Sequence, residues 1–461
     1  MRFRVHMLRL VLVATSAVVV FAQPAWQQKA ASEITDALKK TGAPSVSVVI
    51  IEDSKVAFAQ AFGKADLASN RNAEAGTRYA VGSISKQFTV AALLKLQEQG
   101  KLSLDDKAAK FFPELTRANE ISIWQLLSHT AGYEDYAPQD YLIPEWTHPT
   151  TSATILNDWA KKPLNFDPGA RWQYSNTGYV LAGAIIEKVS GKPLVQFLRE
   201  TVLDPLGMTS AGDCSDRGPA DATAYTRFAL GPPRPVAREG RGWYDGAGEL
   251  CMTAPDLAKW DIAFLQHKLL SAASYEQFTH EVRLKGGDLT HYALGLSVGD
   301  YHGIPMLSHG GEVSGFLALD EKFPTRNGAI IVLSNEDGIS ITGPVADKLA
   351  RLVFLPSQPE EAAADTARVR AVMEGLQRGA IDAGQFTANA RSYFTAEALQ
   401  DIRTSLADLG PLNSVTRTSE TLRGGMTHRS YRAEFLKKTV GLNVYVAADG
   451  KFEQFMVVET L

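Results

Sequence analysis

The sequence shows little charge imbalance and no region dominated by one sign. Its 461 residues include 47 Lys and Arg and 51 Asp and Glu, which gives a net charge of −4. Without a basic excess or a charged run, a nucleic-acid partner and a charged interaction tail are not indicated. The nine histidines lack a metal-ligand spacing such as His-Glu-x-x-His, and no glycine-rich phosphate loop is present. We therefore expect no metal, no nucleotide and no other cofactor.

Long apolar runs are also scarce, and the one that stands out lies at the N-terminus. Arg2, Arg4 and Arg9 precede an uncharged apolar run from Leu10 to Phe21, which ends in small residues near Ala22. This order is typical of a secretory signal peptide, here residues 1–22. The run is short for a membrane span, although an uncleaved anchor is the alternative. We expect an exported protein, periplasmic or secreted, with no stable membrane span after cleavage.

Cysteine is equally scarce, because only Cys214 and Cys251 are present. Neither belongs to a Cys-x-x-Cys pair or lies beside a histidine cluster. In an exported protein two cysteines can form a disulfide, and two separate half-buried thiols are an equally good interpretation. The sequence leaves both open.

What the sequence does contain is enough apolar side chain for a large core, since 45% of the residues are hydrophobic and 21% are charged. The length fits two or three domains, or one large domain with an appendage. Strands are predicted at both ends of the first 356 residues, at 45–52, 56–62, 293–298, 306–309, 316–323 and 329–334. Mainly helices and loops are predicted between them. This order predicts an α/β unit over residues 23–356, with an antiparallel sheet that is split in sequence by an all-helical insertion.

A change of composition near residue 357 predicts a second domain. Ser357-Gln358-Pro359 and the Glu- and Ala-rich segment after it are interpreted as a linker over residues 357–366. The remaining residues, 367–461, show helix patterns at 369–376 and 392–406 and strand patterns at 428–435, 441–447 and 452–459. They predict a small α+β domain, in which no catalytic group of residues is evident and whose function stays open.

Ser83 and Lys86 are the first candidate catalytic residues. They lie at the start of a mostly apolar segment, free of Gly and Pro up to Gly100, which predicts a buried helix. A lysine three residues after a serine places its amine one turn above the hydroxyl on the same helix face. An amine there can take the proton that a hydroxyl must lose before it attacks a carbonyl. The pair alone does not establish catalysis, because exposed helices use both residues.

Two further segments carry candidate site residues. Tyr174-Ser175-Asn176 lies in a turn before a predicted helix, and a phenol can act as a general base or acid if a cation holds its ionised form. His309-Gly310-Gly311 lies between two predicted strands, where glycines let a substrate backbone approach closely. Taken singly, each segment has a structural interpretation: a core tyrosine beside a helix cap, and a glycine turn with a chance histidine.

The order of these three segments resembles the serine β-lactamase and penicillin-binding superfamily, in the branch of class C β-lactamases, D-alanyl-D-alanine carboxypeptidases and serine esterases. The stretches at 126–132, 167–169 and 253–260 look similar to that family as well. The resemblance covers roughly residues 30–355. It implies a β-lactamase-like fold, in which an antiparallel sheet is flanked by helices and an all-helical subdomain is inserted.

The resemblance also implies roles for individual residues. Ser83 would be the nucleophile that accepts the acyl group, and Lys86, desolvated against the core, would be its base or proton relay. Tyr174 would share that proton, pass it to the leaving group and activate the deacylating water. Asn176 would hold an amide of the acyl part of the substrate. The backbone N–H groups of Ser83 and Glu312 would form the oxyanion hole.

The third segment departs from the β-lactamase pattern, in which Lys-Thr-Gly or Lys-Ser-Gly is usual. His309, Gly310 and Gly311 stand there and are expected to contact the substrate, but the fixed cation and the hydroxyl that help to hold a substrate carboxylate are missing. We therefore expect a serine hydrolase that cleaves an ester or amide of a small molecule or peptide, as an esterase or D-amino-acid peptidase rather than an efficient β-lactamase. The alternative is a weak or inactive module that binds cell-wall peptide or penicillin.

Other patterns receive structural interpretations. Gly295-Leu296-Ser297-Val298-Gly299 matches the nucleophile elbow of α/β-hydrolases, but no helix is predicted after it, so Ser297 is interpreted as a strand residue. His129 is interpreted as a residue whose hydrogen bonds fix its loop. Four carboxylates that form no evident acid and base pair are interpreted as caps and solvated surface: Asp105, Asp106, Asp135 and Asp245. The natural substrate and the oligomeric state cannot be read from the sequence.

Overall fold

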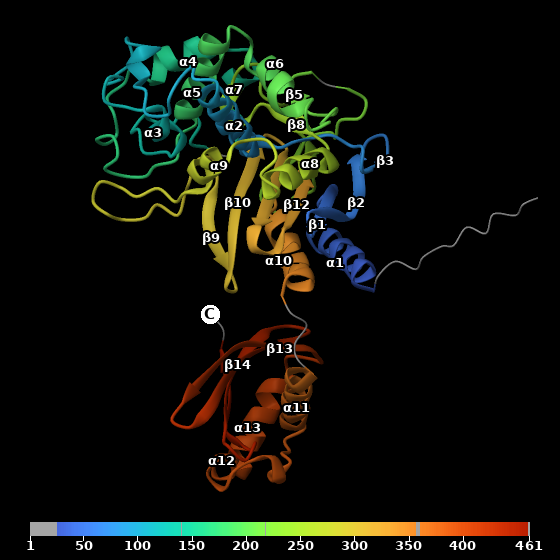
Figure 1. Cartoon of the computed structure of the whole chain (residues 1–461). Coiled ribbons are helices and arrows are strands. Elements are labelled where there is room, and N and C mark those ends of the chain that lie inside the picture. The colour runs from blue at the N-terminus through green and yellow to red at the C-terminus, as the bar shows by residue number, and fades with distance from the viewer. Residues whose placement is uncertain (1–24, 140, 217, 356–359, 460–461) are drawn as a thin grey trace, which may run out of the picture. The chain divides into compact units, whose positions relative to one another are not determined.

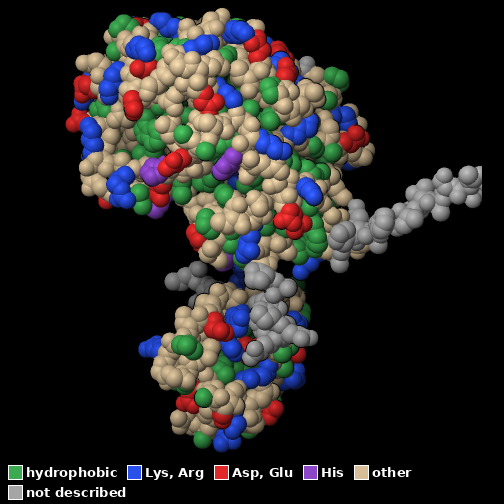
Figure 2. All heavy atoms as spheres, in the orientation of Figure 1, with side chains coloured by type: hydrophobic (Ala, Val, Ile, Leu, Met, Phe, Trp, Pro, Cys, Tyr) green, Lys and Arg blue, Asp and Glu red, His purple; other side chains and the backbone are tan. Residues whose placement is uncertain are grey.

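The chain divides into two compact units, Met1–Leu355 and Pro356–Leu461 (Figure 1). The computed structural model describes residues 25–139, 141–216, 218–355 and 360–459. The predicted signal peptide, residues 1–22, lies outside the described residues. Within the described ranges, no helix has both the length and the apolar character that a membrane crossing requires. Basic and acidic side chains are interspersed over the visible face of the first unit (Figure 2), in keeping with the small net charge.

The first unit is built on a seven-stranded antiparallel sheet with the strand order β3-β2-β1-β12-β11-β10-β9. Its strands are β1 (Ser45–Glu52), β2 (Lys55–Asp66), β3 (Arg71–Asn72), β9 (Ser297–Tyr301), β10 (Ile304–Val313), β11 (Phe316–Phe323) and β12 (Gly328–Ser334). At its centre, β1 pairs with β12, so that Val48 lies opposite Val332. The expectation of a sheet split in sequence is confirmed. The predicted strand at 293–298 starts too early, because Gly295 has a φ of +66° and turns the chain just before β9.

Both faces of the central strands β1 and β12 are buried, which explains the apolar run from Val48 to Ile51 in β1. Val46, Val48 and Ile50 face the helices α1 (Ala25–Thr41) and α10 (Thr342–Val353), which share a core cluster with them. Val49 and Ile51 belong to the larger cluster on the opposite face, where α8 (Ala254–Leu265) packs against β1 and β12. The larger cluster continues into the helices that carry the candidate site.

Between β4 (Tyr79–Ala80) and β9 the regular elements are mainly helices, most of which gather beyond one end of the sheet (Figure 1), whereas α8 lies against a face of it. The helices are α2 (Ser85–Glu98), α3 (Ile123–Leu127), α4 (Ser152–Trp159), α5 (Asn176–Ser190), α6 (Leu194–Leu198), α7 (Asp245–Gly248), α8 and α9 (Ala272–Thr279). Short 3₁₀ turns, η1 (Gly82–Ile84), η2 (Ala108–Lys110) and η3 (Pro144–Thr147), and a π-helical turn, η4 (Arg199–Leu203), connect them. Short strands also occur there: β5 (Gly212–Asp213), β6 (Tyr225–Thr226), β7 (Arg234–Pro235) and β8 (Leu250–Met252).

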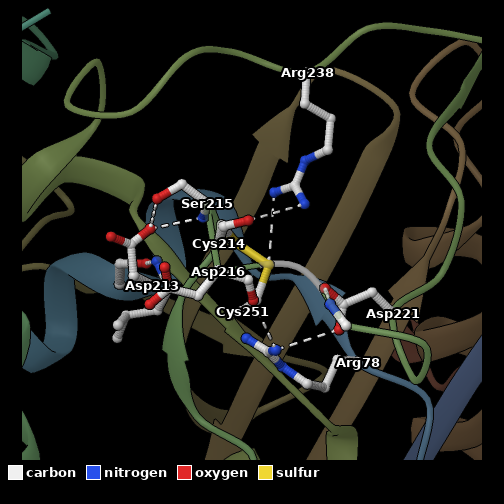
Figure 3. The surroundings of a disulfide bond; sticks show 11 residues. Arg78, Asp213, Cys214, Ser215, Asp216, Asp221, Arg238 and Cys251 are labelled. Carbon is white, nitrogen blue, oxygen red and sulfur yellow. Dashed lines mark hydrogen bonds and ion pairs between the residues drawn. A yellow bond between two sulfur atoms is a disulfide. The ribbon is translucent and has the colours of Figure 1, made fainter. Parts of the chain in front are cut away.

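Cys214 and Cys251 form a disulfide (Figure 3), so the paired interpretation of the two cysteines is the one that the structure shows. Cys251 lies in β8, and it pairs with Ala80 of β4. The neighbouring Leu250 carbonyl accepts a hydrogen bond of 3.0 Å from the Val81 N–H. The disulfide therefore fastens the segment at 214 to the strand that holds the chain just before Ser83.

The second unit is a small α+β domain, as expected, with its own core. Its antiparallel sheet has the order β13-β14-β15-β16, and Val369, Tyr431 and Phe452 are among the buried side chains between sheet and helices. The strands are β13 (Leu412–Arg423), β14 (Met426–Phe435), β15 (Thr439–Val446) and β16 (Phe452–Glu459). The helices are α11 (Glu360–Gln377), α12 (Ala388–Tyr393) and α13 (Ala396–Ala407), and a short 3₁₀ turn, η6 (Ala383–Gln385), precedes α12. The corresponding turn between β11 and β12 of the first unit is η5 (Pro324–Arg326).

One expectation for this region was wrong, and one strand was missed. The predicted linker at 357–366 is helical from Glu360 onward, because Glu and Ala are strong helix formers and extend α11 toward the N-terminus. The sequence also did not predict β13, whose side chains are mostly exposed and polar and so lack the apolar alternation of a half-buried strand.

Candidate active site

Ser83 lies in the 3₁₀ turn η1, two residues before α2 begins at Ser85, rather than at the helix start where it was expected. Gly82 has a φ of +50°, and a Cβ atom there would lie 2.7 Å from the backbone nitrogen of Glu312. A Cβ atom on Gly311 would lie 2.0 Å from the Val81 carbonyl oxygen. The two glycines thus allow the turn that carries Ser83 to pack directly against the backbone of β10. This contact places Gly82, the residue before Ser83, against the backbone of Glu312.

The Lys86 side chain is completely buried beneath this turn. Its Nζ lies 3.0 Å from Ser83 Oγ, 2.8 Å from Asn176 Oδ1 and 2.7 Å from the Ala247 carbonyl oxygen. Burial lowers the pKa of Lys86 to about 7, and the nearby Asp135 carboxylate acts in the opposite direction. An uncharged amine has two N–H donors for the amide and carbonyl oxygens, and its lone pair can then accept the hydroxyl proton of Ser83.

The Tyr174 hydroxyl donates a hydrogen bond of 2.8 Å to Ser83 Oγ. Burial raises the pKa of this phenol, so it is uncharged near neutral pH and can donate a proton. Lys86 Nζ lies 4.8 Å from the centre of the same ring. A hydroxyl and an amine from one segment of the sequence and a phenol from a distant one thus meet at Ser83 Oγ.

The oxygen and the nitrogen of the Asn176 side-chain amide both form hydrogen bonds within the protein. Its Oδ1 accepts from Lys86, and its Nδ2 donates to Asp135 Oδ2 at 3.3 Å. The Asn176 backbone N–H donates to Asp135 Oδ1 at 3.0 Å. Contact between Asn176 and a substrate amide stays a prediction, and the contacts present orient Lys86.

The interpretation of Asp135 as a cap or as solvated surface was wrong. The residue is partly buried in a cavity wall, and burial raises its pKa despite the bonds from Asn176 and Ala137. Asp245 was also misinterpreted, because it is buried against Gly183 and burial raises its pKa to about 7. The only sequence signal for Asp135 was its position just after the stretch at 126–132. By contrast, Asp106 does cap a turn, accepting from the Ser103 N–H.

His129 and His309 are joined through Tyr292, which was not singled out in the sequence. The Tyr292 hydroxyl lies 3.2 Å from His129 Nε2 and 2.9 Å from His309 Nε2. The Ser175 N–H donates to His129 Nδ1 at 3.1 Å, and His309 Nδ1 lies 2.5 Å from the Gly310 carbonyl oxygen. His129 also packs against the Tyr174 ring, with 4.3 Å between ring centres. The loop-fixing interpretation of His129 agrees with these contacts.

The Ser175 N–H and the Gly310 carbonyl lie at the two ends of this series of hydrogen bonds, and they fix the direction of every bond in it. Because the Ser175 N–H can only donate, His129 carries its proton on Nε2 and donates to Tyr292. Because the Gly310 carbonyl can only accept, His309 carries its proton on Nδ1 and accepts from Tyr292 on Nε2. Burial lowers the pKa of His309 to about 4, and nearby Lys86 acts in the same direction. His309 is therefore uncharged at neutral pH and does not replace a fixed cation.

A cavity of about 960 Å³ opens above Ser83. Its walls include Tyr174, Asn176, the strand segment at 309–314 and the segment at 337–343 after β12. All its lining residues belong to the first unit. Within the described part of the chain, no group of three or more His, Cys, Asp or Glu side chains is arranged to hold a metal ion. Ser297, the centre of the rejected nucleophile elbow, is the first residue of β9, and the next element is the strand β10 rather than a helix.

The family model described as Beta-lactamase matches residues 30–355. The chain belongs to the β-lactamase family. It is 27% identical over 312 residues to penicillin-binding protein 4* of Bacillus subtilis (strain 168), an alignment that covers 63% of this chain and 68% of that protein. Members of this family are serine hydrolases, and the chain is an enzyme of this type.

Two solved structures have the same fold. The D-stereospecific amidohydrolase from Streptomyces sp. has a TM-score of 0.60 and 25% identity, over 71% of this chain and 99% of that chain. The octameric penicillin-binding protein homologue from Pyrococcus abyssi has a TM-score of 0.63 and 22% identity, over 92% of this chain and 94% of that chain.

Proposed function

We propose that this serine hydrolase cleaves an ester or amide bond through an acyl-enzyme on Ser83. The observation that carries the proposal is that Ser83 Oγ has Lys86 Nζ at 3.0 Å and the Tyr174 hydroxyl at 2.8 Å, at the wall of a cavity. This geometry provides a nucleophile, a base that is uncharged near neutral pH, and a proton donor.

In the proposed acylation, Ser83 Oγ bonds to the substrate carbonyl carbon as its proton passes to the free amine of Lys86. The carbonyl oxygen becomes an oxyanion, which the N–H groups of Ser83 and Glu312 would stabilise. The proton then passes through the Tyr174 hydroxyl to the leaving alcohol or amine as the scissile bond breaks. Water attacks the acyl-enzyme in the reverse sense, losing its proton to the same pair and restoring Ser83 Oγ–H.

The proposed substrates are esters and amides that need no anchored carboxylate, including D-amino-acid peptides, rather than β-lactams. A cation that would hold a carboxylate is missing from β10, because His309 is uncharged and Gly310 has no side-chain donor. The likeness to a D-stereospecific amidohydrolase supports amide substrates of this kind.

We also infer that the protein is exported. The signal-peptide pattern of residues 1–22 supports export. The disulfide between Cys214 and Cys251 supports it independently, because such bonds persist in oxidising compartments.

Two measurements on the purified protein test the proposed reaction: turnover of p-nitrophenyl acetate and covalent labelling by a fluorophosphonate, located by mass spectrometry. We expect both in the wild type and neither in Ser83→Ala. Ser297→Ala is the matched control, because that serine is the nucleophile of the competing elbow interpretation, and it should retain both. Loss of labelling in Ser297→Ala but not in Ser83→Ala would reject the proposal. A label on Ser83 from a tagged penicillin, without turnover of any ester or amide, would instead favour the binding module.

A further inference from the structure

The catalytic cavity carries carboxylates but no fixed cation. Its lining includes four acidic residues, and among its described lining residues there is no lysine or arginine. The acidic residues are Asp135, Glu239, Glu312 and Asp337. The basic residue in the lining is His309, and both of its ring nitrogens are engaged, by Tyr292 and by the Gly310 carbonyl. Lys86 is not part of the lining.

Three of these carboxylates are held in place by donors from the protein, and in Asp337 the Oδ2 atom accepts from the Gly315 N–H at 2.7 Å. Asp135 Oδ1 accepts from the N–H groups of Ala137 and Asn176, and its Oδ2 from the Asn176 amide. Glu239 Oε1 accepts from the Tyr244 hydroxyl at 2.8 Å and from the Ser314 N–H at 2.9 Å. The second oxygen of Glu239 has no hydrogen-bond or ion-pair partner among the described residues. Because these carboxylates are already oriented, binding a cation costs little additional side-chain entropy.

We propose that the cavity selects acyl donors that carry a protonated amine and disfavours those that carry a carboxylate, with Asp135 and Glu239 as the ammonium acceptors. This inference rests on the proposed function, because it names the substrate class of the same site. It points to D- or L-aminoacyl amides and peptides with a free amino group, and away from peptides that must present a terminal carboxylate to the cavity.

The position of Asp135 links ammonium binding to the reacting groups. Asn176 bridges Asp135 and Lys86, so an ammonium bound at Asp135 would lie near the amine that takes the Ser83 proton. A cation there offsets the negative charge of Asp135, which would otherwise hold the proton on Lys86. A carboxylate would be repelled by the four acidic side chains and would find no cation to pair with.

The test compares three p-nitroanilides of alanine that carry a cationic, a neutral or an anionic group at the alanine nitrogen: the free amine, the N-acetyl derivative and the N-succinyl derivative, each as both enantiomers, at pH 7. We expect kcat/KM of the wild type to fall from cationic to neutral to anionic, with about tenfold or more between the first two. The charge-removing variants are Asp135→Asn and Glu239→Gln, singly and together, since each keeps an oxygen for the backbone donors. The matched control is Glu114→Gln, an exposed carboxylate outside the cavity.

The decisive quantity is the ratio of kcat/KM for the amine to that for its N-acetyl derivative. It should fall about tenfold in the double variant and remain at the wild-type value in Glu114→Gln. A ratio near one in the wild type, or an equal loss for all three substrates in the variants, would overturn the inference, because the latter is what a purely structural role predicts. If Asp135→Asn does not fold, Glu239→Gln alone must lower the ratio.

The inference and the proposed function fail differently. Turnover of p-nitrophenyl acetate without turnover of any anilide would overturn the inference and leave the acyl-enzyme proposal standing. No turnover at all, with no label on Ser83, would remove both.

Discussion

Lys86 is completely buried and makes three polar contacts. The cost of burying an ammonium lowers its pKa to about 7, and the contacts aim its nitrogen at Ser83 Oγ. At the residue scale, the enzyme therefore obtains a base by desolvation of Lys86, and no ionised side chain among the described residues contacts the Lys86 nitrogen directly. The protonation state of the Lys86 amine should therefore control the rate of ester turnover.

The first prediction concerns the pH dependence of ester turnover. Only the uncharged amine can accept a proton, so kcat/KM for p-nitrophenyl acetate should rise about tenfold per pH unit at low pH and level off above about pH 7. Lys86→Arg should lose about 100-fold or more, because a guanidinium stays protonated. Lys39→Arg, on the exposed face of α1, is the control and should behave like the wild type. A flat profile between pH 5 and 8 would contradict this role.

The second prediction concerns Tyr292. Tyr292→Phe removes the hydroxyl that joins His129 to His309, which leaves two buried ring nitrogens without partners. We expect a loss of about 1–3 kcal/mol in the free energy of unfolding. Because His129 packs on Tyr174, kcat should fall about tenfold with little change in KM. Tyr393→Phe, an exposed ring in the second unit, is the control in denaturant titrations and kinetics. An unchanged kcat would show that Tyr292 only stabilises the fold.

The residues of this site were predictable from the sequence to different degrees. Ser83, Lys86 and Tyr174 stand in short recognisable segments, so they could be named without coordinates. Tyr292 carries no local signal and Asp135 only its position after the stretch at 126–132, because the significance of both comes from neighbours that are distant in sequence. The same reason led to the error at Asp245, whose burial depends on the packing of α7 against α5.

At the scale of elements, the site depends on how closely η1 approaches β10. The approach is set by backbone contacts rather than by side chains, since Gly82 and Gly311 face backbone atoms of the other element. An added methyl group has no flexible neighbour to displace at these positions. The spacing between Ser83 and the Glu312 N–H is consequently rigid, as a proposed oxyanion hole requires.

The third prediction compares two adjacent glycines. Gly311→Ala would place its Cβ 2.0 Å from the Val81 carbonyl oxygen, whereas Gly310→Ala would meet its nearest neighbouring atom at 3.9 Å. We expect Gly311→Ala to lower kcat for p-nitrophenyl acetate about 100-fold or more by separating η1 from β10. Gly310→Ala should keep the melting temperature of the wild type, while Gly311→Ala should lower it. Equal melting temperatures and equal rates in the two variants would argue against this account.

The fourth prediction concerns the disulfide. Cys214 and Cys251 are 37 residues apart, so their bond should contribute about 3–4 kcal/mol by restricting the unfolded chain. Replacing both by alanine should lower the free energy of unfolding by that amount. Dithiothreitol should lower the melting temperature of the wild type and leave that of the double variant unchanged. A wild type insensitive to dithiothreitol would contradict the prediction.

Most elements were predictable because their apolar spacing is regular. The strand β1 and the helix α5 have long buried runs, and their types follow from sequence period and length. β13 was missed because it is an edge strand with polar side chains on both faces. Its one local signal was Gly424-Gly425 before Met426, with φ values of +59° and +79° that suit a tight hairpin turn.

At the scale of the whole molecule, the two units have separate hydrophobic cores. Buried clusters of the first unit contain no residue beyond Phe354, and the cluster of the second begins at Val369. All residues that line the cavity belong to the first unit. Folding and the proposed chemistry of the first unit should therefore not depend on the second.

The fifth prediction follows from these separate cores. A chain that ends at Leu355 should fold cooperatively and keep the p-nitrophenyl acetate turnover of the full chain within about threefold. Calorimetry of the full chain should show two unfolding transitions, one of which disappears on truncation. Residues 356–461, produced alone, should reproduce the missing transition. Loss of folding in the truncated chain would show that the units stabilise each other.

The pairing of β1 with β12 has a consequence for how the protein is made. Val46 lies opposite Ser334, so a ribosome must synthesise almost the entire first unit before the central ladder can close. Until then the β1–β2 hairpin keeps one backbone edge unpaired. A nascent polypeptide in this state exposes apolar surface and an unpaired strand edge, so aggregation competes with folding until β12 has been made.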